Sequence, residues 1–148
     1  MSTSPRILVA TDFSDTGDTA LDSASRIAGM MGATLVIAHV RIIPTSAQGE
    51  GMLHAGMETN DPEVAERKLH AIQPAEEGVP VEHRLLTGDP ATEILKLAES
   101  EDVWFIVMGT HGRTGLARLL MGSVAEAVVR RATCPTVLVN PSCKKPNG

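Results

Sequence analysis

The sequence VWFIVMG, residues 103–109, is an apolar run that ends directly before the glycine-rich stretch THGRTGLARLLMG, residues 110–122. An uninterrupted apolar run of this length is typical of a strand buried on both faces of a parallel sheet. The next residues, SVAEAVVRR from Ser123 onward, are expected to form a helix. This order of strand, loop and helix is the repeating unit of α/β proteins.

Four further segments rich in Val, Ile and Leu have the length of strands. They are RILVAT, TLVIAHV, VEHRLL and PTVLVN, at residues 6–11, 34–40, 81–86 and 135–140. The segment VEHRLL alternates between apolar and polar residues, which predicts a strand at the edge of the sheet, whereas the others are nearly continuous apolar runs.

Helices are expected between these strands. In residues 15–31 apolar side chains recur at the spacing of one helix face, and Gly32 is a typical stop signal. Ser123 and Glu126 have the spacing of a capping box, which predicts that Ser123 caps the last helix. Two more helices are expected to begin with Asp as the N-cap and Pro as the first helical residue, at Asp61 with Pro62 and at Asp89 with Pro90.

The alternation of these elements predicts a single α/β domain over residues 1–148. We expect an open parallel sheet of five strands, right-handed crossovers, and helices on both faces. The core is expected within residues 6–140. Residues 42–60 have no clear period and predict a flexible loop, and the polar tail at 141–148 is expected to be disordered.

The composition argues against several classes of partner. The net charge of −5 argues against nucleic acids and membrane surfaces, because both are anionic and bind basic faces. Phe13, Trp104 and Phe105 are the only aromatic residues, too few for a base-stacking platform. The N-terminal residues lack the organisation of a signal peptide, and no apolar run approaches the roughly 20 residues of a membrane helix, so a cytoplasmic location is expected.

The cysteines and most histidines suggest no chemistry of their own. Cys134 and Cys143 form no disulfide framework, and we expect both to be reduced, with a bridge between them as the alternative. The four histidines outside the glycine-rich stretch do not have the spacing of metal ligands; they are His39, His54, His70 and His83.

The glycine-rich stretch is a candidate anion-binding site. Glycines are entropically costly to order, but they let the backbone approach phosphate oxygens closely. The stretch runs into the N-terminus of a helix, where unpaired amides and a partial charge of about +0.5 favour a phosphate group. Arg113 and Arg118 could neutralise part of a triphosphate. The alternative is a purely structural connection between strand and helix.

These glycines are part of a longer pattern. The pattern consists of GTHG at 109–112, then nine residues, then GS at 122–123. It resembles the G-x2-G-x9-G-[S/T] signature of the ATP-binding branch of the universal stress protein family. Three further segments are also similar to that family: ILVATDFS at 7–14, GDPATEIL at 88–95 and CPTVLVN at 134–140. The resemblance covers residues 6–140.

The resemblance implies a fold and an ATP site. The family's strand order is 3-2-1-4-5, which places the ends of the first and fourth strands side by side, where open α/β sheets bind ligands. In the family, Asp12 would meet the adenine or ribose end beside the Ala10 backbone, and the Val40 main chain would contact the base. Met108 and Gly109 would lie against the ribose. With Arg113 added from the loop, the expected ATP-binding residues are Ala10, Asp12, Val40, Met108, Gly109, His111, Gly112, Arg113, Gly122, Ser123, Val124 and Ala125.

Some of these assignments have alternatives. Asp12 could instead be a cap or turn residue, although Ser14 offers a separate cap and so leaves Asp12 freer for a ligand. His111 could donate to phosphate or could be a solvent-exposed bystander. The sequence shows no cluster of carboxylates that would bind a metal ion by itself, so Mg²⁺ would arrive bound to the nucleotide.

The last strand is a candidate dimer interface. Thr136, Val137, Leu138 and Val139 carry no charge, and an uncharged edge strand favours pairing with another chain. The resemblance implies a homodimer in which the last strands of two chains pair antiparallel. An edge covered by the tail is the alternative.

The expected function is that of an ATP-binding universal stress protein, a dimeric regulator or sensor in the stress response with unidentified protein partners. No activated nucleophile or dedicated general base is evident, so at most slow ATP hydrolysis is expected. The alternatives are the non-nucleotide branch of the family, which acts through protein contacts, or an adenine-nucleotide hydrolase. A related ATP pyrophosphatase or synthetase would carry a Ser-Gly-Gly-x-Asp-Ser loop where this chain has ATDFSDTGD.

Overall fold

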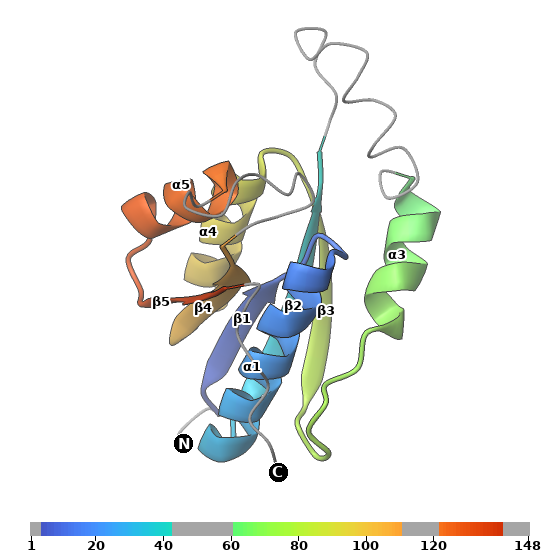
Figure 1. Cartoon of the computed structure of the whole chain (residues 1–148), viewed down its shortest axis with the longest axis vertical. Helices are drawn as coiled ribbons and strands as arrows, with labels where there is room; N and C mark the ends of the chain where they lie inside the picture. The colour runs from blue at the N-terminus through green and yellow to red at the C-terminus, as the bar shows by residue number, and fades with distance from the viewer. Residues whose placement is uncertain (1–3, 43–60, 111–121, 141–148) are drawn as a thin grey trace, which may run out of the picture.

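A computed structural model describes residues 4–42, 61–110 and 122–140, and all structural statements refer to these ranges (Figure 1). Strands and helices alternate along the chain, as the apolar patterns predict. The elements are β1 (Arg6–Ala10), α1 (Asp15–Met31), β2 (Thr34–Arg41), α3 (Pro62–Ala71), β3 (Val81–Thr87), α4 (Pro90–Ser100), β4 (Phe105–Gly109), α5 (Ser123–Arg131) and β5 (Thr136–Val139).

The strands form one parallel sheet of five strands in the order β3-β2-β1-β4-β5. The expected fold class and strand order are therefore confirmed, and VEHRLL lies at an edge as its alternation predicts. The register places Ile7 of β1 between Leu35 of β2 and Phe105 of β4. Strand β4 begins at Phe105 instead of the expected residue 103, because the Val103 amide donates to the Ala98 carbonyl at the end of α4, at 3.1 Å.

The helices cover both faces of the sheet (Figure 1). Alternate side chains of each inner strand point to opposite faces, so the core divides into two clusters. Ile7, Leu35 and Val107 pack with α1 and α3 on one face. Leu8, Val36 and Ile106 pack with α4 and α5 on the other face. The central strands are buried on both faces, which is why they are continuous apolar runs.

The helix ends follow the local sequence signals with one exception. The side chains of Asp61 and Asp89 cap α3 and α4, and Gly32 ends α1 in the left-handed conformation with φ of 65°. The exception is α5, where the N-cap is Gly122 and no side chain caps the helix. The prediction of a Ser123 cap is therefore wrong, because Ser123 is the first helical residue and Glu126 forms an ion pair with Arg130 instead of folding back.

Several sequence-based expectations fall outside the described residues. These include the loop expected at 42–60, of which only Ile42 is described, and the tail at 141–148. Cys143 lies in that tail, whereas Cys134 has a free thiol whose pKa is raised by burial. In the described parts of the chain, no helix is long and apolar enough to cross a membrane.

Four charged side chains link the amino end of β1 with β3 and the end of α4. Arg6 forms ion pairs with Glu82 and Glu101, each at 2.7 Å. Arg84 forms ion pairs with the same two carboxylates, at 2.6 Å and 3.0 Å. Hydrogen bonds from Arg6 and then from Arg84 lower the pKa of Glu82 from 4.5 to about 2. The ionised form of Glu82 is therefore favoured in the folded state.

We expect the replacement Glu82→Gln to destabilise the fold in a pH-dependent way. Because the pKa of Glu82 is lower in the folded state, its stabilising effect is complete above pH 4.5 and is lost as the pH falls toward about 2. The network is partly solvent-exposed, so each pair contributes at most about 1 kcal/mol. Urea unfolding should be measured at a series of pH values from neutral to acid. The difference in the free energy of unfolding between wild type and variant should shrink as the pH falls. Glu77→Gln, at an exposed position, is the control, and an equal or pH-independent effect in both variants would contradict the assignment.

Candidate functional site

The carboxyl ends of β1, β2 and β4 meet at one edge of the sheet. Strand β1 lies between β2 and β4, and the direction in which successive strands are added reverses there. In open α/β sheets a ligand binds at such a reversal, because the helices leave adjacent strands toward opposite faces. Asp12, Val40 and Gly109 lie at the ends of these three strands. The candidate site is this edge together with the start of α5.

The structure brings together five of the residues predicted from the sequence. Val40, Met108 and Ala125 are buried in the cluster on the face of α4 and α5, and Ala10 and Val124 pack against it. These residues come from β1, β2, β4 and α5. Since their side chains fill the core, a ligand at this edge would meet mainly their backbone groups, which agrees with the main-chain contact expected at Val40.

Both ends of the glycine-rich stretch are fastened to the sheet. The Gly122 amide donates to the Thr110 carbonyl at 2.6 Å, and the Thr110 amide donates to the Val139 carbonyl at 3.1 Å. The Thr110 hydroxyl donates to the Asn140 side chain at 3.3 Å. This clasp fixes the start of α5 next to the ends of β4 and β5. It also occupies the Gly122 amide, so the amides left for an anion are those of the first turn, from Ser123 onward.

The N-terminus of α5 differs from those of the other helices. Side chains of Ser14, Asp61 and Asp89 accept hydrogen bonds from first-turn amides of α1, α3 and α4. Of the four helices whose starts the structure describes, α5 alone has no side-chain cap. The first amides of a helix have no intrahelical acceptor, and the helix dipole adds partial positive charge there. The start of α5 can therefore stabilise an anion.

The turn between β1 and α1 is tightly hydrogen-bonded. One oxygen of Asp12, Oδ1, accepts from the Ser14 amide at 3.0 Å and also from the Ser14 hydroxyl. Ser14 does cap α1, accepting from the Gly17 amide at 3.2 Å. The expectation that this cap leaves Asp12 freer is wrong, because the carboxylate of Asp12 holds the capping serine. Asp12 is both a turn residue and a neighbour of the candidate site.

Sequence reasoning missed three residues that build this turn. Thr11 is buried, and its hydroxyl oxygen accepts from the Phe13 amide at 3.0 Å. A Cβ at Gly17 would lie 2.9 Å from that oxygen, so glycine allows α1 to approach the turn. His39, buried in β2, contacts the Thr11 carbonyl through Nδ1 at 2.8 Å. Two features of the sequence could have indicated this turn: a glycine, Gly17, in the first turn of a predicted helix, and a histidine, His39, within an apolar strand.

Other predicted residues lie apart from this geometry or outside it. His111, Gly112 and Arg113 fall outside the described residues, as does Arg118. The four residues of the expected dimer interface form β5 at the edge of the sheet. Within the described ranges, no group of three or more His, Cys, Asp or Glu side chains is placed to hold a metal ion.

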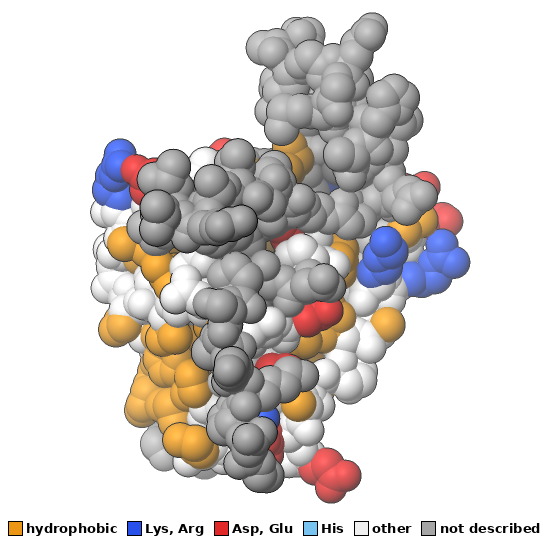
Figure 2. Space-filling view, viewed as in Figure 1, with side chains coloured by type: hydrophobic (Ala, Val, Ile, Leu, Met, Phe, Trp, Pro, Cys, Tyr) orange, Lys and Arg blue, Asp and Glu red, His pale blue; other side chains and the backbone are white. Residues whose placement is uncertain are grey.

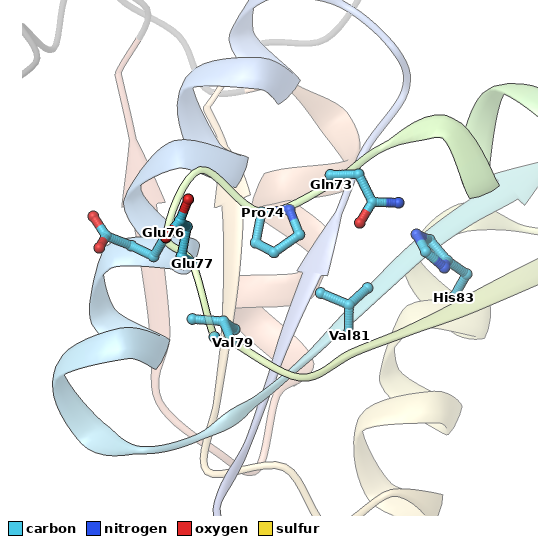
Figure 3. A pocket seen from close by; sticks show the side chains of 8 residues that line it. Gln73, Pro74, Glu76, Glu77, Val79, Val81 and His83 are labelled. Atoms are coloured by element: carbon cyan, nitrogen blue, oxygen red, sulfur yellow. The ribbon is translucent and has the colours of Figure 1, made fainter.

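Two hollows lined by described residues lie away from the candidate site. The first lies along the connection between α3 and β3, where Glu76, Val79 and His83 line it (Figure 3). The second lies at the end of α4 and includes Val103 and Cys134. Neither includes a residue of the predicted ATP site, so these hollows give that site no support.

Known proteins resemble this chain along nearly its whole length. The model of the universal stress protein family matches residues 4–140. Universal stress protein MJ0531 of Methanocaldococcus jannaschii is 36% identical over 146 residues, which are 95% of this chain and 82% of the relative. The structure of MJ0577 from the same organism has a TM-score of 0.74 at 29% identity, covering 99% of this chain and 100% of that chain. The crystal structure of a universal stress protein in complex with cAMP has a TM-score of 0.63 at 27% identity, covering 95% of this chain and 100% of that chain.

The matched region includes every described strand and helix, from Arg6 at the start of β1 to Val139 at the end of β5. The order of the strands and the placement of the helices also agree with the solved structures. The chain belongs to the universal stress protein family.

Proposed function

We propose that this protein binds ATP, accompanied by Mg²⁺, at the carboxyl edge of its sheet and acts as a dimeric regulator or sensor in the stress response. The observation that carries the proposal is the uncapped N-terminus of α5, held by the clasp between Gly122 and Thr110 at the point where the strand order reverses. This arrangement combines a helix start whose N-cap residue has no capping side chain, the partial positive charge of the helix dipole and a reversal of strand order in one place.

The phosphate end of the nucleotide would lie at α5. Amides of Ser123, Val124 and Ala125 belong to the first turn, and the glycine spacing that precedes them leaves room for close backbone approach. Glu126 would otherwise repel a polyphosphate, but its ion pair with Arg130 directs it toward the helix's C-terminal end. Arg113 and His111 are expected to contribute from the connecting stretch.

The nucleoside end would lie across the ends of β1 and β2. Asp12 is expected to accept from the ribose or adenine, and the backbones at Ala10 and Val40 to flank the base. Met108 and Gly109 would lie beside the ribose. A universal stress protein of known structure at 27% identity is in complex with cAMP, an adenine nucleotide, which supports the choice of an adenine nucleotide as the ligand. Mg²⁺ would bind through the phosphates, where it neutralises their charge.

A binding role fits these residues better than a transfer reaction. The amides at α5 and the turn at Asp12 can bind and orient a nucleotide, and no side chain proposed for the site serves as a nucleophile toward it. Regulation would then require that the ATP-bound and empty states differ in their affinity for a partner protein. Slow hydrolysis by water remains compatible with this proposal.

Addition of Mg-ATP should raise the melting temperature, and the replacement Ser123→Asp should reduce that rise by about half or more. A ligand at a hundred times its dissociation constant stabilises the fold by about 2.7 kcal/mol. The new carboxylate suits the first helical position, where the helix dipole stabilises it, but it repels phosphate and should weaken binding by about tenfold or more. Thermal melting and calorimetric titration measure the two effects.

Thr133→Asp is the matched control, since it makes the same change of charge at the exposed connection beyond the other end of α5. It should retain the ATP-induced shift. Wild-type protein that responds to no adenine nucleotide would overturn the proposal and favour the alternative of a stress protein that acts through protein contacts. Equal loss in both variants would show that net charge, and not the start of α5, governs binding.

We also propose that β5 forms the dimer interface. The carbonyl of Pro135, just before β5, accepts a hydrogen bond from the Ile106 amide, and the Val139 carbonyl accepts one from the Thr110 amide. The alternate residues Thr136 and Leu138 therefore direct their backbone groups toward the open edge of the sheet. These groups would pair with the same strand of a second copy. Figure 2 shows hydrophobic side chains gathered at the lower left, beneath the part of the sheet formed by β4 and β5. Such an edge is suited to a protein partner.

The replacement Thr136→Pro should convert a dimer to a monomer. Proline removes one outward amide at the first residue of β5, a position where a strand tolerates it and where the ladder to β4 does not depend on it. Sedimentation velocity should report the loss, with circular dichroism confirming the fold. Thr136→Ala, which keeps the amide, should remain dimeric. A wild-type monomer at high concentration, or a dimeric Thr136→Pro variant, would contradict the proposed interface.

A further inference from the structure

The turn between β1 and α1 contains a residue in an unfavourable backbone conformation. Phe13 has φ of 66°, in the left-handed region that a bulky side chain rarely adopts. Such a conformation persists only where the surroundings determine it, and it is common beside ligand-binding groups. Phe13 lies directly after Asp12, a residue of the proposed ATP site. The contacts that hold Phe13 therefore also decide where Asp12 lies.

His39 makes two of those contacts. Its Nδ1 lies 2.8 Å from the Thr11 carbonyl oxygen, and because a carbonyl can only accept, this nitrogen must carry the proton. Its ring lies against the Phe13 ring, with 4.3 Å between the ring centroids. The Lys68 ammonium lies 5.9 Å from the centroid of the Phe13 ring. His39 thus holds the residues on either side of Asp12.

His39 is placed to act on the site indirectly. It precedes Val40 in β2, and adjacent side chains of a strand point to opposite faces of the sheet. Val40 packs with α4 and α5, the face that carries the start of the phosphate-binding helix, whereas His39 contacts Phe13, which packs with α1. The imidazole therefore supports the turn from the side opposite to the proposed nucleotide contacts.

We propose that His39 is a positioning residue of the nucleotide site: it locks Thr11 and Phe13, and through them sets the position of Asp12. This inference rests on the proposed function for its consequence, namely nucleotide affinity. Its structural part, the locking of the turn, is independent of any ligand. The Ser14 amide reports on that part directly, because it donates to Asp12 within the locked turn.

Two variants separate the two contacts of His39. His39→Asn places an amide nitrogen where Nδ1 was and keeps the donor to Thr11, whereas His39→Phe keeps the ring contact and removes the donor. We expect the Phe variant to speed hydrogen exchange at the Phe13 and Ser14 amides and to weaken ATP binding, each by about tenfold, equivalent to about 1.4 kcal/mol. The Asn variant should stay within about threefold of wild type in both measurements.

His83 offers a matched control on the neighbouring strand. Its Nε2 contacts the Ile72 carbonyl oxygen at 2.9 Å, and its ring lies 4.8 Å from that of His70, measured between centroids. His83→Phe removes a comparable histidine–carbonyl hydrogen bond away from the turn. It should leave the exchange of the Ser14 amide and the affinity for ATP unchanged, even if it lowers global stability.

The outcomes distinguish this inference from the proposed function. If wild-type protein binds no adenine nucleotide, the proposed function fails, and the exchange rates still decide whether His39 locks the turn. If the Phe variant does not fold, nitrogen NMR of wild-type His39 decides, since a proton on Nε2 with none on Nδ1 would overturn the inference. Wild-type exchange of the Phe13 and Ser14 amides in the Phe variant would overturn it as well.

Discussion

The handedness of the connections between parallel strands determines where this protein can bind a ligand. A strand–helix–strand connection is right-handed, so the direction in which the chain moves across the sheet decides which face its helix covers. From β1 the chain moves outward through β2 to β3, which places α1 and α3 on one face. It then returns past β1 to β4 and β5, which places α4 and α5 on the other face. The reversal of strand order at β1 and β4 follows from these two directions.

The chemistry of this edge of the sheet depends on which backbone amides are already paired. At α1, α3 and α4 the side chain of the N-cap residue accepts a hydrogen bond from one first-turn amide. At α5 the preceding amide, from Gly122, is paired with Thr110, but the N-cap residue Gly122 has no side chain that could accept from the first turn. The same fold therefore positions α5 firmly and leaves its positive end able to stabilise an anion.

The accuracy of the sequence-based predictions followed the range of the interactions involved. Asp61 and Asp89 were identified as caps because the capping oxygen and the amide it accepts from are within three residues of each other. Ser123 has an equally good local pattern, yet Gly122 takes the capping position because Thr110, across the glycine-rich stretch, fixes its amide. The role of Asp12 depends partly on a contact of longer range. Its hydrogen bonds to Ser14 are local, but the left-handed conformation of Phe13 that accompanies them depends on His39, from another strand.

The sequence by itself determined the class of fold, the approximate bounds of the elements and the glycine spacing that identifies the family, because apolar periodicity and turn residues act over short stretches of chain. The tertiary structure alone decided that Ala10, Val40, Met108 and Ala125 pack into one cluster, and that Arg6 reaches Glu82 and Glu101. It also decided that a buried histidine of β2 supports the turn after β1. These contacts join residues from separate strands and helices, and only the pairing of the strands brings such residues within bonding distance.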